Sequence, residues 1–374
     1  MPSPALFPKK FLLKGSPKEI GFQHGEQLQA EIRSQIDVYD AMFQYTSKLN
    51  WAAVREVAQA YHDTVARLTP DIYAEMQGIA DGSGRDILDI VALNCRSEIA
   101  LGLFSDGCSA LGWQSAGDAG DETQERDGVV VLAQNWDWTP QVQSNLALLT
   151  IEQDDGRPTV HMMVEAGLVG KIGFNSASVG VCQNAIRARP TDPSRLPYHV
   201  ACRIALNSTS VAAAVKAIQD MGGIASTQHL LMADRKSGPL SCEMSPRGDA
   251  FIKPDPLDGI VCHTNHLLAN KFVDEPPWLA GSPVRLQRIQ KLTAQLAREG
   301  GFITGDVLRA RIFSDTFNAP QAICCQGDPD WPIETRSQTL MCIVMFLGSG
   351  TTPRAEIVWG QPGSGSESEV IHFY

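Results

Sequence analysis

The order in which helical and strand patterns follow one another limits the folds open to this chain. Residues 17–105 place apolar side chains such as Ile20 and Leu28 at helical spacing. From Cys108 onward the pattern changes to short, β-branched segments separated by Gly, Asn or Asp, and the first of these covers 129–133. A block of helices therefore precedes a block of strands.

Further strands and helices are predicted along the rest of the chain. The strands fall at 146–151, 159–164, 170–174, 179–183, 229–233, 241–244, 260–263, 339–346 and 355–359. The helices fall at 198–206, 210–219, 284–298 and 304–312. Because strands do not alternate with single helices, a βαβ dinucleotide-binding fold is excluded. We expect an α+β fold in which helices cover two stacked sheets.

Composition narrows the classes of partner. The chain has 374 residues, of which 43% are hydrophobic, so it can form a sizeable core in one large domain or two smaller ones. Its formal net charge of −11 argues against nucleic acid and anionic membranes as partners, although solubility alone also explains it. No run of about 18 apolar residues predicts a transmembrane helix.

The two ends of the chain bear on its location. Prolines within the first ten residues interrupt the apolar stretch that a signal peptide needs. The last residues, 370–374, do not match the Ser-Lys-Leu peroxisomal address. We therefore expect an intracellular protein, with the cytoplasm as the default compartment.

The nine cysteines point to one residue. They include no C-x-x-C pair, and their spacing resembles neither a zinc site nor a disulfide framework. Most lie in apolar segments, as Cys182 and Cys342 do, and are interpreted as buried small hydrophobic residues. Cys108 differs because it lies in the polar sequence Asp-Gly-Cys-Ser.

The pair Gly107 and Cys108 suits a cysteine that cuts the peptide bond before it. Attack of the thiol on the preceding carbonyl needs an unusual backbone conformation, which glycine adopts at little steric cost. Cleavage would give Cys108 a free α-amine, a group whose ordinary pKa is about 8. One residue would then supply both nucleophile and base. A buried cysteine without a catalytic role is the other interpretation.

A second candidate is Asn265, which follows the predicted strand 260–263. An amide side chain at a strand end can direct an N–H toward an oxyanion, although an Asn there can also cap a turn through its own backbone. His263 and His266 lie close to it in sequence. Since no carboxylate or thiol lies at ligand spacing, we expect no metal there.

A third candidate is the pair Asn135 and Asp137, which are two residues apart in a predicted strand and so share a face. A buried carboxylate at 137 could orient the new amine or pair with a cation. Arg336, at the start of a later strand, could supply that cation. A structural aspartate and a surface arginine are the alternatives. The chain contains no G-x-S-x-G, P-loop or H-E-x-x-H motif.

A series of short segments runs through nearly the whole chain. The segments are GFQHG (21–25), DGC (106–108), QNWD (134–137), EAG (165–167), GFNSA (173–177), RIAL (203–206), SP (245–246), HTNH (263–266) and TR (335–336) before TL (339–340). Each is common alone, but the order and spacing are specific. Together they resemble the acyl-coenzyme A:isopenicillin N acyltransferase family, the cysteine members of the N-terminal nucleophile hydrolases.

This resemblance implies a fold and a maturation. The fold is the N-terminal nucleophile hydrolase fold, a four-layer αββα sandwich of two stacked, mainly antiparallel sheets. The chain would cut itself between Gly107 and Cys108. Residues 1–107 would become a mostly helical α-subunit or pro-segment, and residues 108–374 a β-subunit. The two would form one intertwined globular unit, so the cleaved fragment 1–107 would be a partner of the rest.

The resemblance also implies roles for single residues. Cys108 aligns with the nucleophile of the family, Asn265 with its oxyanion donor and Asp137 with the carboxylate near the new terminus. Arg336 aligns with the active-site arginine, and Ser245 with a serine implicated in processing and activity. The residues themselves gave no reason to choose Ser245.

One position departs from the family pattern. Thr335 stands where the penicillin-forming members have Ser, which keeps the hydroxyl and adds a methyl group. This weakens the case for a penicillin substrate and leaves the thiol chemistry unchanged.

The expected function is movement of an acyl group from an acyl-coenzyme A or N-acyl amide, through a thioester on Cys108, to an amine or water. The partners would be a small-molecule acyl donor and an amine acceptor. No metal or cofactor is expected, although acyl-coenzyme A could be a co-substrate. Two alternatives stay open: a hydrolase that uses only water as acceptor, and an uncut, inactive homologue that acts as a binding module.

Overall fold

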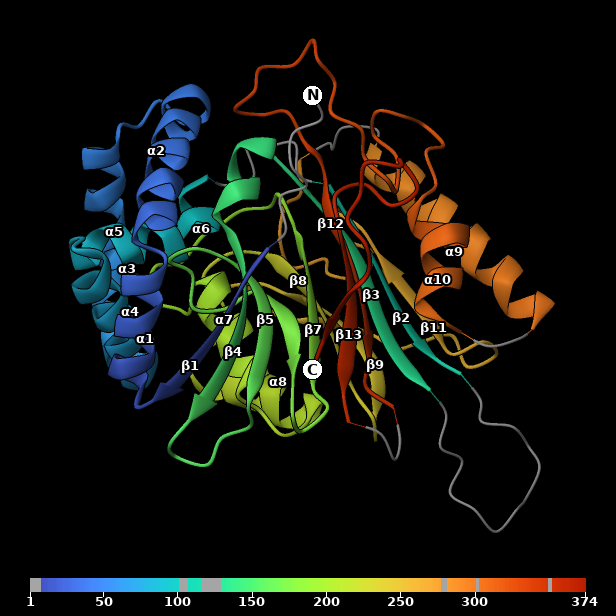
Figure 1. Cartoon of the computed structure of the whole chain (residues 1–374), viewed down its shortest axis with the longest axis horizontal. Helices are drawn as coiled ribbons and strands as arrows, with labels where there is room; N and C mark the ends of the chain where they lie inside the picture. The colour runs from blue at the N-terminus through green and yellow to red at the C-terminus, as the bar shows by residue number, and fades with distance from the viewer. Residues whose placement is uncertain (1–7, 101–106, 116–128, 277–280, 301–302, 349–351) are drawn as a thin grey trace.

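Two stacked β-sheets with helices on both outer faces form the molecule (Figure 1). The structure, a computed structural model, describes residues 8–100, 107–115, 129–276, 281–300, 303–348 and 352–374. The four layers are the predicted αββα sandwich, so the expected α+β class is confirmed.

Sheet A contains eight strands within the described residues. In spatial order they are β1 (Lys9–Gly15), β4 (Leu146–Gln153), β5 (Val160–Glu165), β6 (Ile172–Asn175), β7 (Gly180–Ala185), β8 (Gln228–Asp234), β9 (Gly238–Met244) and β10 (Ala250–Ile252). The pair β1 and β4 is parallel, and every other neighbouring pair is antiparallel.

Sheet B contains six strands in the same part of the chain, all paired antiparallel. In spatial order they are β11 (Ile260–His263), β2 (Gly107–Gln114), β3 (Val130–Trp138), β12 (Gln338–Phe346), β13 (Arg354–Trp359) and β14 (Ile371–Phe373). Strands β2, β3 and β12 are buried almost throughout because sheet A covers one face and helices the other.

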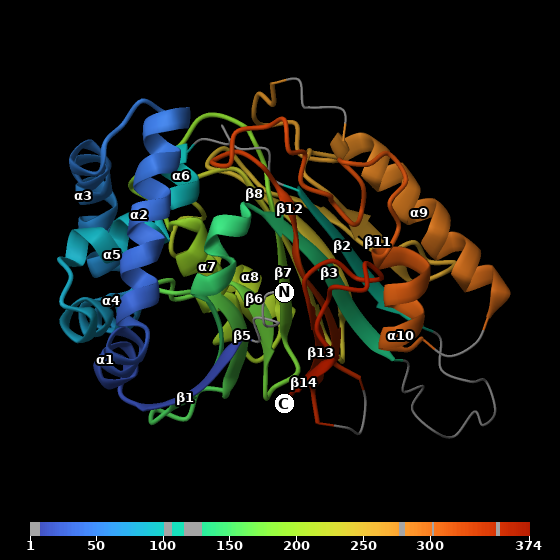
Figure 2. The same ribbon diagram turned by 45° about the horizontal axis from the view of Figure 1, so that its top comes forward.

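Eight of the described helices lie on the side of sheet A, and two lie on the side of sheet B (Figures 1 and 2). The first group is α1 (Pro17–Gln27), α2 (Gln29–Thr46), α3 (Trp51–Leu68), α4 (Pro70–Ser83), α5 (Ile87–Asn94), α6 (Arg96–Ala100), α7 (Tyr198–Leu206) and α8 (Val211–Asp220). The second group is α9 (Gly281–Glu299) and α10 (Gly305–Leu308). A 3₁₀ turn covers Pro140–Asn145, and a π-helical turn covers Arg309–Phe313. None of the described helices is long and apolar enough to span a membrane.

The segment GFQHG at 21–25 has a packing role. A side chain at Gly21 would collide with the backbone of α4, as would one at Gly25, so the two glycines allow α1 and α4 to pack backbone against backbone. Between them, His24 is buried, and its Nε2 accepts a hydrogen bond of 3.0 Å from the N–H of Gly167. The segment therefore joins the N-terminal helices to sheet A.

Several elements match their predicted bounds, and others do not. The predicted helix 198–206 is α7, and the predicted strand 260–263 is β11. Strand β3 extends to Trp138, five residues beyond its predicted end, because its polar residues are buried and hydrogen-bonded inside the sandwich. The edge strands β1, β10 and β14 were not predicted, since short or charged edge strands carry little apolar pattern.

Candidate active site

Cys108 lies near the start of β2, between β11 and β3 in sheet B, and is 4% exposed. It lies directly opposite Trp136 of β3. Directly opposed residues share a face of a sheet, and both belong to the core between the two sheets. The Cys108 side chain therefore faces sheet A.

Side chains from three other elements hold the backbone of Cys108. Its N–H donates to Asn265 Oδ1 at 2.8 Å. Its carbonyl oxygen accepts from Arg285 Nη1 at 2.7 Å and from Asn184 Nδ2 at 3.1 Å. The ladder between β11 and β2 ends at Ala110, so side chains replace a strand partner at Cys108. The residue is fixed on both sides of its α-carbon.

Asn265 presents its two amide atoms in different directions. The Oδ1 atom faces Cys108, whereas Nδ2 donates to the carbonyl of Ala185, at the end of β7, at 3.1 Å. Its backbone N–H donates to Ser282 Oγ, in the first turn of α9, at 2.8 Å. A side-chain amide carries two N–H hydrogens, so one remains for an oxyanion.

Arg285 is a residue that the sequence reasoning missed. It lies on α9, is 4% exposed, and also donates from Nη2 to Asn265 Oδ1 at 2.9 Å and from Nη1 to Ser109 Oγ at 3.2 Å. Hydrogen bonds from an ionised donor are about twice as strong as neutral ones. The available signal was an arginine on the apolar stripe of a helix, next to Leu286.

Asp137 lies beside the bond that self-cleavage would cut. It is opposite Gly107 in the β2–β3 ladder, and its Oδ1 accepts from the Thr339 hydroxyl at 2.6 Å. A Cβ atom at position 107 would collide with the Asp137 carboxylate. Gly107 is the first residue of a regular strand, and the close approach of this carboxylate gives a packing reason for a glycine there.

Two other predicted site residues, Thr335 and Arg336, lie in the segment that precedes β12. Arg336 donates to the carbonyls of Pro329 and Trp331, at 2.7 and 2.8 Å, rather than to the Asp137 carboxylate. Thr335 and Arg336 line a small pocket of about 10 Å³ together with Trp138.

Ser245 closes a turn after β9. Its hydroxyl donates to the Gly248 carbonyl at 2.6 Å and accepts from the N–H groups of Arg247 and Gly248. These contacts give Ser245 a structural place in the turn.

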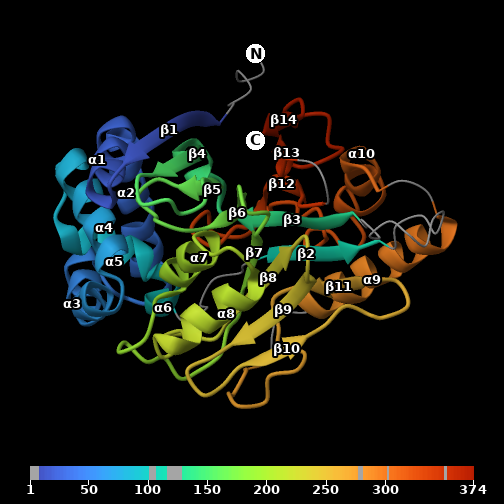
Figure 3. The ribbon, with the colours of Figure 1, turned by 90° about the horizontal axis from the view of Figure 1, so that it is seen from below.

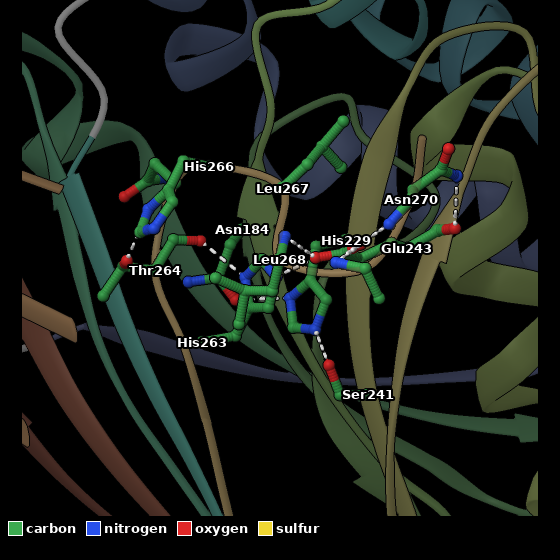
Figure 4. A network of polar contacts seen from close by, with 12 residues as sticks. Asn184, His229, Ser241, Glu243, His263, Thr264, His266, Leu267, Leu268 and Asn270 are labelled. Atoms are coloured by element: carbon green, nitrogen blue, oxygen red, sulfur yellow. Dashed lines mark hydrogen bonds and ion pairs between the residues drawn. The ribbon is translucent and has the colours of Figure 1, made fainter. Parts of the chain in front are cut away.

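A polar network runs from Asn184, which contacts the Cys108 carbonyl, into sheet A, and Figure 4 shows it from Asn184 onward. Asn184, which donates to that carbonyl, contacts His229 Nδ1 through its Oδ1 at 2.8 Å. His229 Nε2 lies 2.9 Å from Ser241 Oγ. Burial and the neighbouring His263 hold the pKa of His229 well below its ordinary value, so its ring is neutral.

The network continues to a buried carboxylate. The rings of His229 and His263 stack with centroids 3.5 Å apart, and His263 Nε2 lies 2.8 Å from Glu243 Oε1. Glu243 also accepts from the N–H groups of Leu268 and Asn270 (Figure 4). Burial alone would raise the pKa of Glu243, but these hydrogen bonds lower it to about 2. We call Asn184, His229, Ser241, His263 and Glu243 the imidazole network.

The two histidines near Asn265 both contact other side chains of the protein. His263 contacts Glu243, and His266 Nδ1 lies 2.8 Å from Ser282 Oγ. Across the described part of the chain, no three His, Cys, Asp or Glu side chains are grouped as metal ligands would be.

A charged cluster lies on the side of Cys108 that faces α2 and α6. Glu165 forms ion pairs with Arg96, at 2.6 Å, and with Lys171. Tyr39 also donates to Glu165, at 2.5 Å. Burial alone would raise the pKa of Glu165, but the two cations hold it well below its ordinary value. We call Glu165, Arg96 and Lys171 the charged cluster.

Comparisons with known proteins place this arrangement in a family. The family profile described as acyl-coenzyme A:6-aminopenicillanic acid acyl-transferase matches residues 123–364. The chain is 32% identical over 365 residues to the acyl-coenzyme A:6-aminopenicillanic-acid-acyltransferase 40 kDa form of Emericella nidulans, covering 96% of this chain and 95% of that protein. An uncharacterised protein of Archaeoglobus fulgidus is 27% identical over 208 residues, which is 48% of this chain and 33% of the relative.

A solved structure shows a partial likeness. Penicillin V acylase from Agrobacterium tumefaciens aligns with a TM-score of 0.42 and 14% identity, over 67% of this chain and 83% of the acylase. The family assignment depends instead on the profile and on the relative that spans nearly the whole chain. On those grounds the chain belongs to the acyl-coenzyme A:6-aminopenicillanic acid acyl-transferase family, as its sequence resemblance predicted.

Proposed function

We propose that the protein is a self-processing acyltransferase and amidohydrolase that uses Cys108 as its nucleophile. It takes an acyl group from an acyl-coenzyme A or an N-acyl amide and passes it to an amine or to water. Membership of an acyltransferase family supports the reaction class. The self-cleavage, the thioester and the roles of single residues are proposed from the geometry.

Maturation would begin with attack of the Cys108 sulfur on the carbonyl carbon of Gly107. The C–S bond forms, the C–N bond breaks, and the nitrogen takes a proton to become an α-amine. Water then hydrolyses the thioester and leaves residues 1–107 with a free carboxylate. Asp137, which lies against Gly107, would orient the new amine.

Turnover would use the same sulfur. The α-amine takes the thiol proton, and the thiolate attacks the acyl carbon of the donor. The oxyanion receives an N–H from Asn265 and another from the backbone, and each such donor is worth about 2.7–4 kcal/mol in related sites. The leaving thiol or amine takes the proton from the amine. An acceptor amine or water then displaces the enzyme sulfur by the reverse sequence.

The observation that supports the proposal most strongly is the set of hydrogen bonds that Asn265 and Arg285 make to the backbone of Cys108. The nitrogen that would become the α-amine already donates to Asn265 Oδ1, and Arg285 fixes both Asn265 and the Cys108 carbonyl. One set of contacts therefore holds, before cleavage, the three groups to which the proposal gives the roles of nucleophile, base and oxyanion donor. No described cysteine other than Cys108 has this set of contacts.

Mass spectrometry of the intact protein tests both maturation and acylation. We expect two chains, 1–107 and 108–374, and an added acyl mass on the second chain after exposure to an acyl-coenzyme A. A Cys108→Ala protein is expected to stay as one chain and to take no acyl group. If stepwise degradation of active protein returned only the sequence that starts at residue 1, the proposal would be wrong.

The acceptor decides between transfer and hydrolysis. Incubation with an acyl-coenzyme A and an amine should give an amide whose amount depends on the amine concentration. Free acid alone would show a hydrolase that uses only water. A single chain that neither cuts itself nor takes an acyl group would favour a binding module.

A further inference from the structure

The cutting step needs a base that the proposed function does not supply. Before cleavage the nitrogen of Cys108 is an amide, which cannot accept a proton at neutral pH. The α-amine that serves as base in turnover exists only afterwards. Another group must therefore take the thiol proton during maturation.

Lys171 lies where such a base is needed. It is 0% exposed and comes from sheet A, just before β6. Its Nζ lies 3.5 Å from the centroid of the Trp136 ring. Trp136 is directly opposite Cys108, and opposed residues have Cβ atoms about 4.5–5.5 Å apart on the same face. The amine therefore lies on the same side of sheet B as the thiol, and the two groups interact electrostatically.

The charged cluster can lose the Lys171 proton without leaving a lone charge. It holds two cations, Arg96 and Lys171, around one carboxylate, Glu165. An arginine side chain keeps its proton in proteins. Loss of the Lys171 proton leaves Arg96 and Glu165 as a neutral ion pair, which is the less costly state in a dry interior.

The surroundings of Lys171 favour this loss near neutral pH. Burial lowers the pKa of Lys171 to about 8, with Glu165 raising the pKa and Arg96 lowering it further. Lys171 is then neutral in about a tenth of the protein molecules at pH 7 and in about half of them at pH 8.

The other titratable groups around the cluster are poorer bases. Among the described residues, besides Glu165 and Arg96, they are Tyr39 of α2, Glu98 of α6, Cys108 of β2, Cys182 of β7, and Tyr198, His199 and Cys202 of α7. Glu98 Oε1 already accepts hydrogen bonds from the Ser226 hydroxyl and from the N–H of Tyr198. Burial raises the pKa of Cys182 and of Tyr198, so both stay protonated. Burial and the two cations hold the pKa of His199 well below its ordinary value. Burial raises the pKa of Tyr39 and of Cys202, so both stay protonated. Glu165 is ionised but has too low a pKa to hold a proton.

We propose that Lys171 is the base that activates the Cys108 thiol when the chain cuts itself, a role that rests on the proposed self-cleavage. The neutral amine takes the thiol proton, and the thiolate attacks the Gly107 carbonyl. As the C–N bond breaks, the resulting ammonium returns the proton to the leaving nitrogen. Lys171 ends the step neutral, and no other reactant is needed.

The rival account gives Lys171 a structural role only, as a counter-ion of Glu165 that rests on an aromatic face. Two substitutions separate these accounts. Lys171→Met removes the charge and leaves Arg96 to pair with Glu165. Lys171→Arg keeps the charge but cannot lose it. Lys216→Arg, at an exposed lysine that pairs with Asp220, is the matched control.

The experiment follows cleavage of the full chain made by cell-free synthesis. A short pulse of labelled amino acid is chased at fixed pH, and the two fragments are separated on a denaturing gel. General-base catalysis contributes about 10²–10⁴-fold. We therefore expect Lys171→Met and Lys171→Arg to cut at least about 100-fold more slowly than the unchanged chain, and Lys216→Arg to cut at the unchanged rate.

The pH profile gives a readout that a structural role would not move. We expect the cleavage rate of the unchanged chain to rise with pH and to level off above about 8. Arg96→Met removes the like charge that lowers the pKa of Lys171, so the midpoint should move to higher pH. This measurement decides the question even where a Lys171 variant fails to fold.

Each outcome bears on one proposal or the other. Cutting of Lys171→Arg at the unchanged rate, or a rate of the unchanged chain that is flat from pH 6 to pH 9, would overturn the role of Lys171 and leave self-cleavage standing. An unchanged chain that stays whole at every pH would overturn self-cleavage itself.

Discussion

Two buried polar regions meet at Cys108, and they differ in what they can do with a proton. The charged cluster has two cations for one carboxylate, and the pKa of Lys171, about 8, lies near physiological pH. The imidazole network joins amide, hydroxyl and imidazole groups, and it ends on a carboxylate held by four hydrogen bonds. The first region can move a proton, and the second can hold a backbone still.

The regions also differ in where their residues come from. Arg96 belongs to the N-terminal helices, whereas Glu165 and Lys171 belong to sheet A. The imidazole network lies wholly within 184–270. The cluster that contains the proposed base for cleavage thus draws residues from both prospective subunits, whereas the imidazole network draws its residues from one. The following predictions test this contrast.

The largest effect is expected at Glu165. Glu165→Gln leaves two buried cations without their carboxylate, which typically costs about 3–5 kcal/mol of unfolding free energy. The loss should be smaller at pH 9 than at pH 6, because Lys171 can lose its proton. Urea unfolding of the uncut Cys108→Ala protein measures it. Glu152→Gln, at a surface ion pair with Lys14, is the control and should cost about 0–1 kcal/mol.

At Glu165 we expect the main effect on stability, whereas at Arg285 we expect the main effect on the rate of cleavage. Arg285→Met removes the donor that joins Cys108 and Asn265, so cleavage should slow by about 100-fold, comparable to the loss of one oxyanion donor. The stability cost should be smaller than at Glu165, about 1–3 kcal/mol, because the Cys108 carbonyl and Asn265 Oδ1 each lose one donor and keep another. The gel assay and urea unfolding give the two values. A cleavage rate within threefold of the unchanged chain would contradict this prediction.

In the imidazole network, Asn184 should contribute to stability by holding the Cys108 carbonyl and the His229 ring in position. Asn184→Ala removes a donor to the Cys108 carbonyl and a partner of His229, at an expected cost of about 1–3 kcal/mol. In a double-mutant cycle with His229→Gln, the two changes should be coupled by at least about 0.5 kcal/mol. Additive costs would show that the two residues do not act as one network.

The smallest effect is a change in pH dependence at His229. The buried ring is neutral, whereas the same residue in the unfolded chain binds a proton below about pH 6.5. Its contribution to stability is therefore present above that pH and is lost as the pH falls, by up to about 1.4 kcal/mol per unit. His229→Gln should flatten the plot of unfolding free energy against pH between 6.5 and 5. Other buried groups are the same in both proteins, so their contributions cancel.

Sequence patterns predicted the layers of the fold and part of the site. Blocks of helical and strand periodicity depend on neighbouring residues, which is why α7 and β11 were placed correctly and the αββα class followed. Cys108 and Asn265 were chosen separately, and the structure brings them into contact. Whether they have the proposed roles is still to be measured.

The residues that were missed share a physical reason. Arg285, Asn184 and Lys171 act across elements that are far apart in sequence, so their partners cannot be read from spacing. Lys171 lies in the otherwise apolar segment 168–174, and a charged residue there is a usable signal that a buried partner must satisfy it. Arg336 shows the converse, since the family pattern pointed to it while its hydrogen bonds stay within its own loop.

Strand β1 has a consequence for the state of the protein after maturation. It lies ahead of the proposed cut, yet it pairs in parallel with β4, so sheet A is completed by the segment that would be severed (Figure 3). Departure of that segment would open a sheet edge to water and strip Glu165 of one counter-ion. The two polypeptides should therefore migrate together under native conditions and fail to exchange with free copies. Cleavage of the peptide bond would therefore leave the two polypeptides as one stable complex.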